Sequence, residues 1–205
     1  MNTHTFDSPI AVAEEAARLT VELLSAAITK KGSASFVLAG GSTPNLAYGI
    51  LADQYLEALD WSKVTFLIGD ERIGPLDGPD NNWQLIEELF LQHIPKVTFL
   101  RPHSNLRAEE AATSYQKAIE ALSAYDVTWL GMGPDGHTLS LFPGHPDFSS
   151  TETRLVVPIH NSPKPPASRI SLSLHALAAS KATIILATGE SKREAVTDAL
   201  QPTST

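Results

Sequence analysis

The strongest candidate for chemistry in this sequence is a histidine in a glycine-rich turn. His137 closes the segment 133–137, shortly after the apolar run 126–130. Histidine changes protonation near neutral pH, so it can take a proton from water and act as a general base. We predict that His137 and Asp135 are catalytic, with Gly136 at the substrate. A structural alternative stays open here: a hydrogen-bonded histidine, with the aspartate and glycine capping a following short helix.

A second candidate site is a glycine turn that follows the apolar run 35–39 and precedes a helical pattern. The turn consists of Gly40, Gly41, Ser42, Thr43 and Pro44. Glycines let the backbone approach an anion closely, and a helix N-terminus offers free N–H groups to a phosphate. The turn has neither the Lys-Ser/Thr pair of a Walker loop nor the third glycine of a dinucleotide fingerprint. A plain strand-to-helix turn with a hydroxyl cap is the equal alternative.

Two charged segments could complete a site for an anion. Arg72 ends the segment 69–72 and could bind a phosphate through both arms of its guanidinium, with Asp70 and Glu71 orienting it. Lys164 opens a proline-rich stretch that could hold its ammonium group over a ligand. Surface ion pairs and a solvated connector are the respective alternatives.

Composition narrows the classes of partner. The chain has 205 residues, 42% of them hydrophobic, which suits one domain over residues 1–205. The net charge of −8 disfavours nucleic acid. No apolar run approaches the length of a membrane span, and the first eight residues do not look like a signal peptide. We therefore expect a cytoplasmic protein that binds neither nucleic acid nor a membrane.

Metal chemistry is not expected. The sequence contains no cysteine, which excludes disulfides and thiolate ligands. Apart from His137, the histidines stand at positions 4, 93, 103, 145, 160 and 175, without the spacing of metal ligands. We predict no metal site and no cofactor.

Apolar runs alternate with helical patterns along the chain. Strands are predicted at 35–39, 64–68, 97–100, 126–130, 155–159, 170–174 and 183–187, and helices at 9–31, from 44, and at 82–92, 107–123 and 191–200. This alternation predicts a three-layer, Rossmann-like α/β fold, in which helices flank a mainly parallel sheet. Ligands bind beyond the C-terminal ends of such strands, so the segments 40–44, 69–72 and 131–137 should converge there.

Together these segments resemble the 6-phosphogluconolactonase family, which shares its fold with glucosamine-6-phosphate deaminase. The matching stretches are 38–44, 69–72, 79–83, 130–138, 140–144, 164–166 and 169–172, in order over nearly the whole chain. The resemblance implies hydrolysis of 6-phospho-D-glucono-1,5-lactone to 6-phosphogluconate in the oxidative pentose phosphate pathway. It also implies that His137 is the catalytic base and that residues 40–43, Arg72 and Lys164 gather the phosphate, with Arg169 nearby.

Some features set this chain apart within the resemblance. Phe142 stands where the deaminase relatives carry a glutamate that takes part in ring opening, so a deaminase-like isomerase is the weaker alternative. A non-catalytic phosphosugar-binding sensor is another. Trp83 replaces a frequent tyrosine, and an end at Thr205 would omit a further C-terminal strand. The expected partner is a small phosphorylated sugar lactone, bound by a monomer or a weak homo-oligomer.

Overall fold

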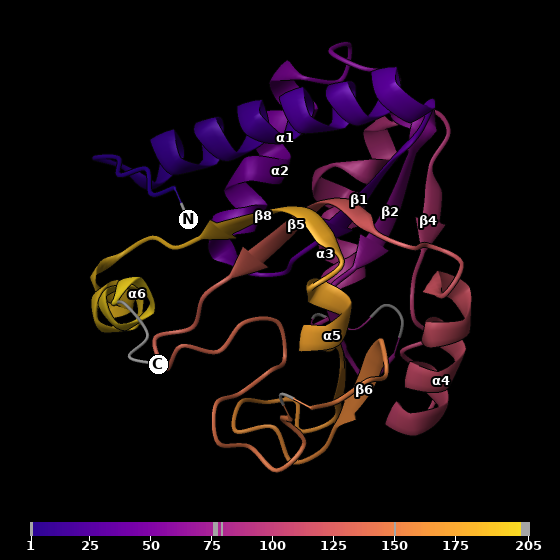
Figure 1. Ribbon diagram of the computed structural model, residues 1–205, viewed down its shortest axis with the longest axis vertical. Coiled ribbons are helices and arrows are strands. Elements are labelled where there is room, and N and C mark those ends of the chain that lie inside the picture. Colours follow the sequence, from indigo (N-terminus) through magenta and orange to yellow (C-terminus); the bar gives the residue numbers. More distant parts are fainter. Residues whose placement is uncertain (1, 76–77, 79, 150, 202–205) are drawn as a thin grey trace.

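A parallel sheet of five strands forms the centre of the protein (Figure 1). The computed structural model describes residues 2–75, 78, 80–149 and 151–201. In spatial order the strands are β4 (Thr98–Leu100), β2 (Val64–Ile68), β1 (Ala34–Leu38), β5 (Tyr125–Gly131) and β8 (Ser180–Leu186). Each neighbouring pair runs parallel. The predicted α/β fold with a parallel sheet is therefore confirmed.

The helices are α1 (Pro9–Lys31), α2 (Ser42–Gln54), α3 (Asn82–Leu89), α4 (Ala108–Ile119), α5 (Leu174–Leu177) and α6 (Arg193–Leu200). Helices α1, α2 and α4 contact strands of this sheet. The longest helix, α1, contacts β1, β5, β8 and α2, whereas α4 contacts β4 on the other side of the view (Figure 1). No helix in the described part of the chain is long and apolar enough to cross a membrane.

Local sequence signals explain where the helices begin and end. Ser8 caps α1 by accepting a hydrogen bond from the Ala11 N–H at 3.2 Å, and Gly32 ends it with φ of +81°. Both limits of this helix were predicted. The helix predicted at 107–123 stops at Ile119, and the one predicted at 82–92 stops at Leu89, before a 3₁₀ turn. Helix ends fray into such turns, which sequence patterns locate poorly.

Two of the predicted strands belong to a separate, antiparallel sheet. Its strands are β3 (Asp70–Arg72), β7 (Arg169–Leu172) and β6 (Val156–Ile159), in that spatial order. The connection 160–168 between β6 and β7 is too short for the crossover that parallel neighbours need, so the two strands pair antiparallel. Alternating apolar runs did not reveal this second sheet.

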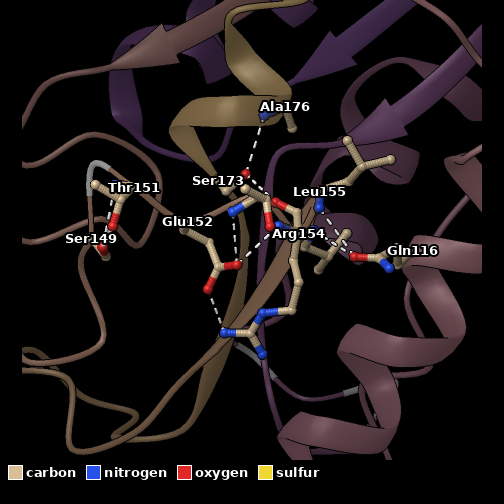
Figure 2. Close-up of polar contacts among 10 residues, drawn as sticks. Gln116, Ser149, Thr151, Glu152, Arg154, Leu155, Ser173 and Ala176 are labelled. Carbon is tan, nitrogen blue, oxygen red and sulfur yellow. Dashed lines mark hydrogen bonds and ion pairs between the residues drawn. The ribbon is translucent and has the colours of Figure 1, made fainter.

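Side-chain hydrogen bonds attach the antiparallel sheet to the helices around it (Figure 2). The Gln116 side chain of α4 accepts a hydrogen bond from the Leu155 N–H at 3.0 Å. Ser173 caps α5 by accepting from the Ala176 N–H at 3.1 Å, and its hydroxyl donates to the Arg154 carbonyl at 2.5 Å. These contacts fix β6 and β7 beside the parallel sheet, where loops from both sheets can meet.

Candidate active site

A pocket of about 260 Å³ opens where the loops after the parallel strands meet the antiparallel sheet. Of the predicted site residues, those that line it are Gly40, Gly41, Ser42, Thr43, Asp70, Arg72, His137, Lys164 and Arg169. The loops after β1, β2 and β5 therefore converge, as the α/β pattern predicted. Asp135 and Gly136 do not line the pocket, although both shape the turn that carries His137.

Two charged side chains, Asp135 and Lys164, lie next to Nδ1 of the His137 imidazole. Its Nδ1 is 2.5 Å from Asp135 Oδ1, and Lys164 Nζ lies 3.1 Å from each of these two atoms. Burial raises the pKa of Asp135, but hydrogen bonds from His137 and Lys164 outweigh it and lower that pKa to about 2. An ionised Asp135 favours a proton on Nδ1, which leaves Nε2 of His137 as an acceptor.

The turn that presents His137 is not the start of a helix. The Gly133 N–H donates to the His137 carbonyl at 2.8 Å, and Gly136, exposed and at φ of +77°, reverses the chain between them. The alternative in which Asp135 and Gly136 cap a following short helix is therefore wrong. The predicted contact of Gly136 with substrate has no support from its position outside the pocket lining.

The N-terminus of α2 also lines the pocket. Gly41, at φ of +113°, precedes the first turn, and no side chain caps it. The alternative of a hydroxyl-capped turn is therefore wrong, and the first N–H groups of α2 face the pocket edge with partial positive charge. Gly40 is in close contact with α3, because a Cβ there would lie 2.1 Å from Asn82 Oδ1.

Arg72 borders the pocket from β3. Its Nη1 donates to the Asp80 carbonyl, and its buried Nε has no acceptor among the residues that the structure describes. Glu71 is 1% exposed and accepts from the backbone N–H groups of Arg72, Asn82 and Trp83 at 2.8, 2.8 and 2.9 Å. Glu71 thus fixes the backbone here. The expectation that it orients the Arg72 guanidinium is not met, because its carboxylate accepts from backbone N–H groups.

Asp70, which lines the pocket, is likewise hydrogen-bonded to groups other than the Arg72 guanidinium. It is 6% exposed, and its Oδ2 accepts from the Ser140 hydroxyl at 2.7 Å. Its backbone carbonyl accepts from Asn82 Nδ2 at 2.9 Å. Because both acids of this segment are buried, the alternative of a surface ion-pair cluster is wrong as well.

Lys192 was not among the predicted site residues, yet it lines the pocket. It ends the 3₁₀ turn Glu190–Lys192, which follows β8 and the glycine at position 189 (φ of +87°). A strand followed by a polar segment that contains glycine recurs here, as in the segments 40–44 and 131–137. That repeated pattern was the signal that would have identified the lysine.

These observations define a class of site: a pocket at the strand ends of an α/β fold, which is lined by a histidine paired with an aspartate, by cations and by a helix N-terminus. Such a pocket suits a small anionic ligand. The family described as glucosamine-6-phosphate isomerases/6-phosphogluconolactonase matches residues 7–205, and the chain belongs to it. In the described ranges no three His, Cys, Asp or Glu side chains form a group suited to a metal ion.

Individual relatives agree with this assignment. A 6-phosphogluconolactonase of Streptomyces coelicolor is 36% identical over 95% of this chain and 80% of its own length. A probable chloroplastic 6-phosphogluconolactonase of Oryza sativa subsp. indica is 34% identical over 98% of this chain and 66% of its own. The solved 6-phosphogluconolactonase of Trypanosoma brucei superposes with a TM-score of 0.90 at 29% identity, covering 98% of this chain and 87% of that one.

Proposed function

We propose that this protein is a hydrolase that converts 6-phospho-D-glucono-1,5-lactone to 6-phosphogluconate, a step of the oxidative pentose phosphate pathway. The observation that carries the proposal is the pair of His137 and Asp135, 2.5 Å apart, at a pocket that also holds the N-terminus of α2 and Arg72. The names of the relatives support the same substrate.

In this reaction His137 acts as a general base. Its Nε2 takes a proton from water while the water oxygen attacks the lactone carbonyl carbon. The tetrahedral oxyanion needs hydrogen-bond donors, which the N–H groups of the glycine turns can supply. The bond between the carbonyl carbon and the ring oxygen then breaks, and the imidazolium returns its proton to that oxygen. Asp135 stabilises the charged imidazole between the two transfers.

The phosphate binds at the other side of the pocket. The first N–H groups of α2, the hydroxyl of Ser42, Arg72 and Lys192 provide donors and positive charge there. Lys164 was expected to join this group. Its Nζ lies 3.1 Å from His137 Nδ1, so we assign it to the base and not to the phosphate.

Phe142 argues against the deaminase alternative. Its ring stacks on the His137 imidazole, with centroids 4.7 Å apart. A phenyl ring cannot relay a proton, so the carboxyl group that the deaminase relatives use beside their histidine is replaced by an apolar contact. A non-catalytic sensor would bind the phosphosugar in the same pocket but would not turn it over, so a turnover assay distinguishes the two functions.

The test is turnover of the phosphorylated δ-lactone by the purified protein, corrected for spontaneous opening. His137→Gln should lower kcat by roughly 10²- to 10⁴-fold, because general-base catalysis is worth that much. The exposed His175, outside the pocket, provides the control variant His175→Gln, which should retain activity. Unchanged turnover in His137→Gln would overturn the mechanism. Tight phosphogluconate binding without turnover would identify a sensor, and ammonia release from glucosamine 6-phosphate a deaminase.

Two further measurements use the same assay. Arg72→Ala should lower kcat/KM more for the phosphorylated lactone than for the unphosphorylated one, since a hydrogen bond to a charged group contributes roughly 1.5–3 kcal/mol. An equal loss for both substrates indicates a structural role. Activity should also survive exhaustive chelation, and zinc-dependent recovery after chelation would contradict a mechanism without metal.

A further inference from the structure

Arg169, predicted to lie near the phosphate, uses its guanidinium within the protein. Arg169 is the first residue of β7 and is 4% exposed. Its Nε donates to the Pro166 carbonyl at 3.1 Å, and its Nη2 donates to the carbonyls of Lys164 at 3.1 Å and Pro165 at 2.8 Å. One planar guanidinium therefore holds three consecutive carbonyl groups, a geometry that only an arginine fork can provide.

The segment held in this way (residues 164–166, here the proline segment) has few other hydrogen bonds. Neither proline carries an N–H group, so the backbone can donate only at Lys164. That N–H donates to Ser162 Oγ at 3.3 Å, and the Ser162 hydroxyl donates back to the Lys164 carbonyl at 2.8 Å. The position of the Lys164 backbone thus depends on Arg169 from one side and Ser162 from the other.

Lys164 transmits this position to the base. Its Nζ is 3.1 Å from both His137 Nδ1 and Asp135 Oδ1, so a small shift of its backbone changes both contacts.

We propose that Arg169 is a positioning residue that holds Lys164 against the Asp135–His137 pair, and that it does not bind the substrate phosphate. The inference rests on the proposed hydrolase function. Without the guanidinium fork the proline segment loses three carbonyl contacts, and the ammonium of Lys164 leaves its place beside the carboxylate and the imidazole. Displacement of a catalytic group by about 1 Å can lower a rate by roughly 100-fold.

A double-mutant cycle tests this assignment. Arg169→Lys keeps the positive charge but cannot hold three carbonyls, so kcat should fall by up to about 100-fold while KM for the phosphorylated lactone changes little. In a Lys164→Met background the same substitution should have almost no further effect, because its route to the base is already gone. Arg154→Lys, at an arginine that does not line the pocket, is the matched control and should retain kcat.

Two other results would contradict the positioning role of Arg169. A raised KM with unchanged kcat, or a loss in the double variant equal to the product of the two single losses, would overturn the proposal and make Arg169 a substrate ligand. If Arg169→Lys does not fold, Ser162→Ala loosens the same segment from the other side. Its kcat loss should appear in the wild-type background and be absent in Lys164→Met, and an equal loss in both would contradict the proposal.

A readout without turnover separates this inference from the proposed function. The imidazole ¹⁵N chemical shifts of His137 report the hydrogen bonding of Nδ1, so Arg169→Lys should move them toward the values of Lys164→Met. If wild-type protein does not hydrolyse the lactone, the proposed function fails while this comparison still decides the role of Arg169. Shifts identical to wild type in Arg169→Lys would refute the positioning role even in an active enzyme.

Discussion

The two ends of the parallel sheet each bury a carboxylate, and they hold it with different partners. At the N-terminal end, Asp126 Oδ2 is 2.8 Å from both the Ser35 N–H and Lys31 Nζ, and its Oδ1 is 2.9 Å from Lys181 Nζ. At the C-terminal end, Glu71 accepts from backbone N–H groups at 2.8–2.9 Å. Two lysine side chains therefore help to hold Asp126, whereas Glu71 is held by backbone N–H groups beside the pocket.

Because their partners differ, the pKa values of Asp126 and Glu71 shift in opposite directions. Burial raises the pKa of Asp126, but hydrogen bonds from Lys31, Lys181 and the Ser35 backbone together outweigh it, so the pKa lies below its ordinary value. Burial likewise raises the pKa of Glu71, and here the backbone hydrogen bonds do not compensate, so it reaches about 7. Glu71 is thus held without a cation, whereas at the opposite end two lysines join α1, β5 and β8 through Asp126.

The largest effect is expected for a substitution at Gly133, whose backbone lies close to the His137 imidazole. A Cβ on Gly133 would lie 1.9 Å from His137 Nδ1, whereas a Cβ on Gly49, within α2, meets nothing within 4 Å. Gly133→Ala must therefore displace the imidazole, and kcat should fall by roughly 100-fold. Gly49→Ala should leave kcat unchanged and stabilise the helix by about 0.5–1 kcal/mol. Steady-state kinetics and thermal unfolding measure both, and full activity in Gly133→Ala would contradict the placement of His137.

The second prediction concerns Glu71 and the pocket end. In Glu71→Gln the amide nitrogen cannot accept, so at least one backbone N–H of Arg72, Asn82 or Trp83 loses its partner. A buried donor without an acceptor costs about 1–3 kcal/mol of unfolding free energy. Because Arg72 and Asn82 both line the pocket, kcat/KM should fall as well. Denaturant unfolding together with kinetics at pH 5 measures both effects.

The cost of Glu71→Gln should also depend on pH. The folded pKa of about 7 lies above the ordinary value of 4.5, so between these values the folded protein binds more protons than the unfolded chain. Wild-type stability therefore declines as pH rises through this window, by at most about 3 kcal/mol from this group. The variant lacks this decline, so the difference between the two proteins should narrow from pH 5 to pH 8. A constant difference would show that Glu71 is already ionised at pH 5.

The pocket end also shows how far sequence reasoning reaches. Segments 40–44 and 131–137 were predictable because each follows a strand and contains glycines, which places their polar groups at the C-terminal edge of the sheet. Glu71 was misjudged because a charged triplet looks exposed, and only the tertiary structure brings the N–H groups of α3 to it. Lys192 was missed because the segment 191–200 was predicted as a helix, and the start of that helix was not considered as a possible part of the site.

The antiparallel sheet was hidden for a related reason. Apolar runs show that β6 and β7 are buried, but not which strand each one pairs with. One of the two partners of β7 is the three-residue strand β3, whose sequence is the charged run ending in Arg72. This sheet positions Arg72 and Arg169, and the connection between β6 and β7 carries Lys164. The placement of these three pocket residues therefore depends on pairings that a single sequence does not reveal.

The smallest expected effect is at the N-terminal end of the sheet. The lysine side chains that contact Asp126 are 40% and 55% exposed, so water solvates them when the carboxylate is removed. Asp126→Asn should therefore cost about 1 kcal/mol of unfolding free energy, within the range of partly exposed ion pairs, and leave kcat unchanged. The stabilisation from a lowered pKa is fully present above the ordinary value of 3.8 and is lost only as pH falls below it. Between pH 5 and pH 8 the difference from wild type should thus stay constant, in contrast to Glu71→Gln. Unfolding curves at these two pH values decide the matter: a difference that changes with pH, or a loss of turnover, would mean that the two ends of the sheet are not separated in function.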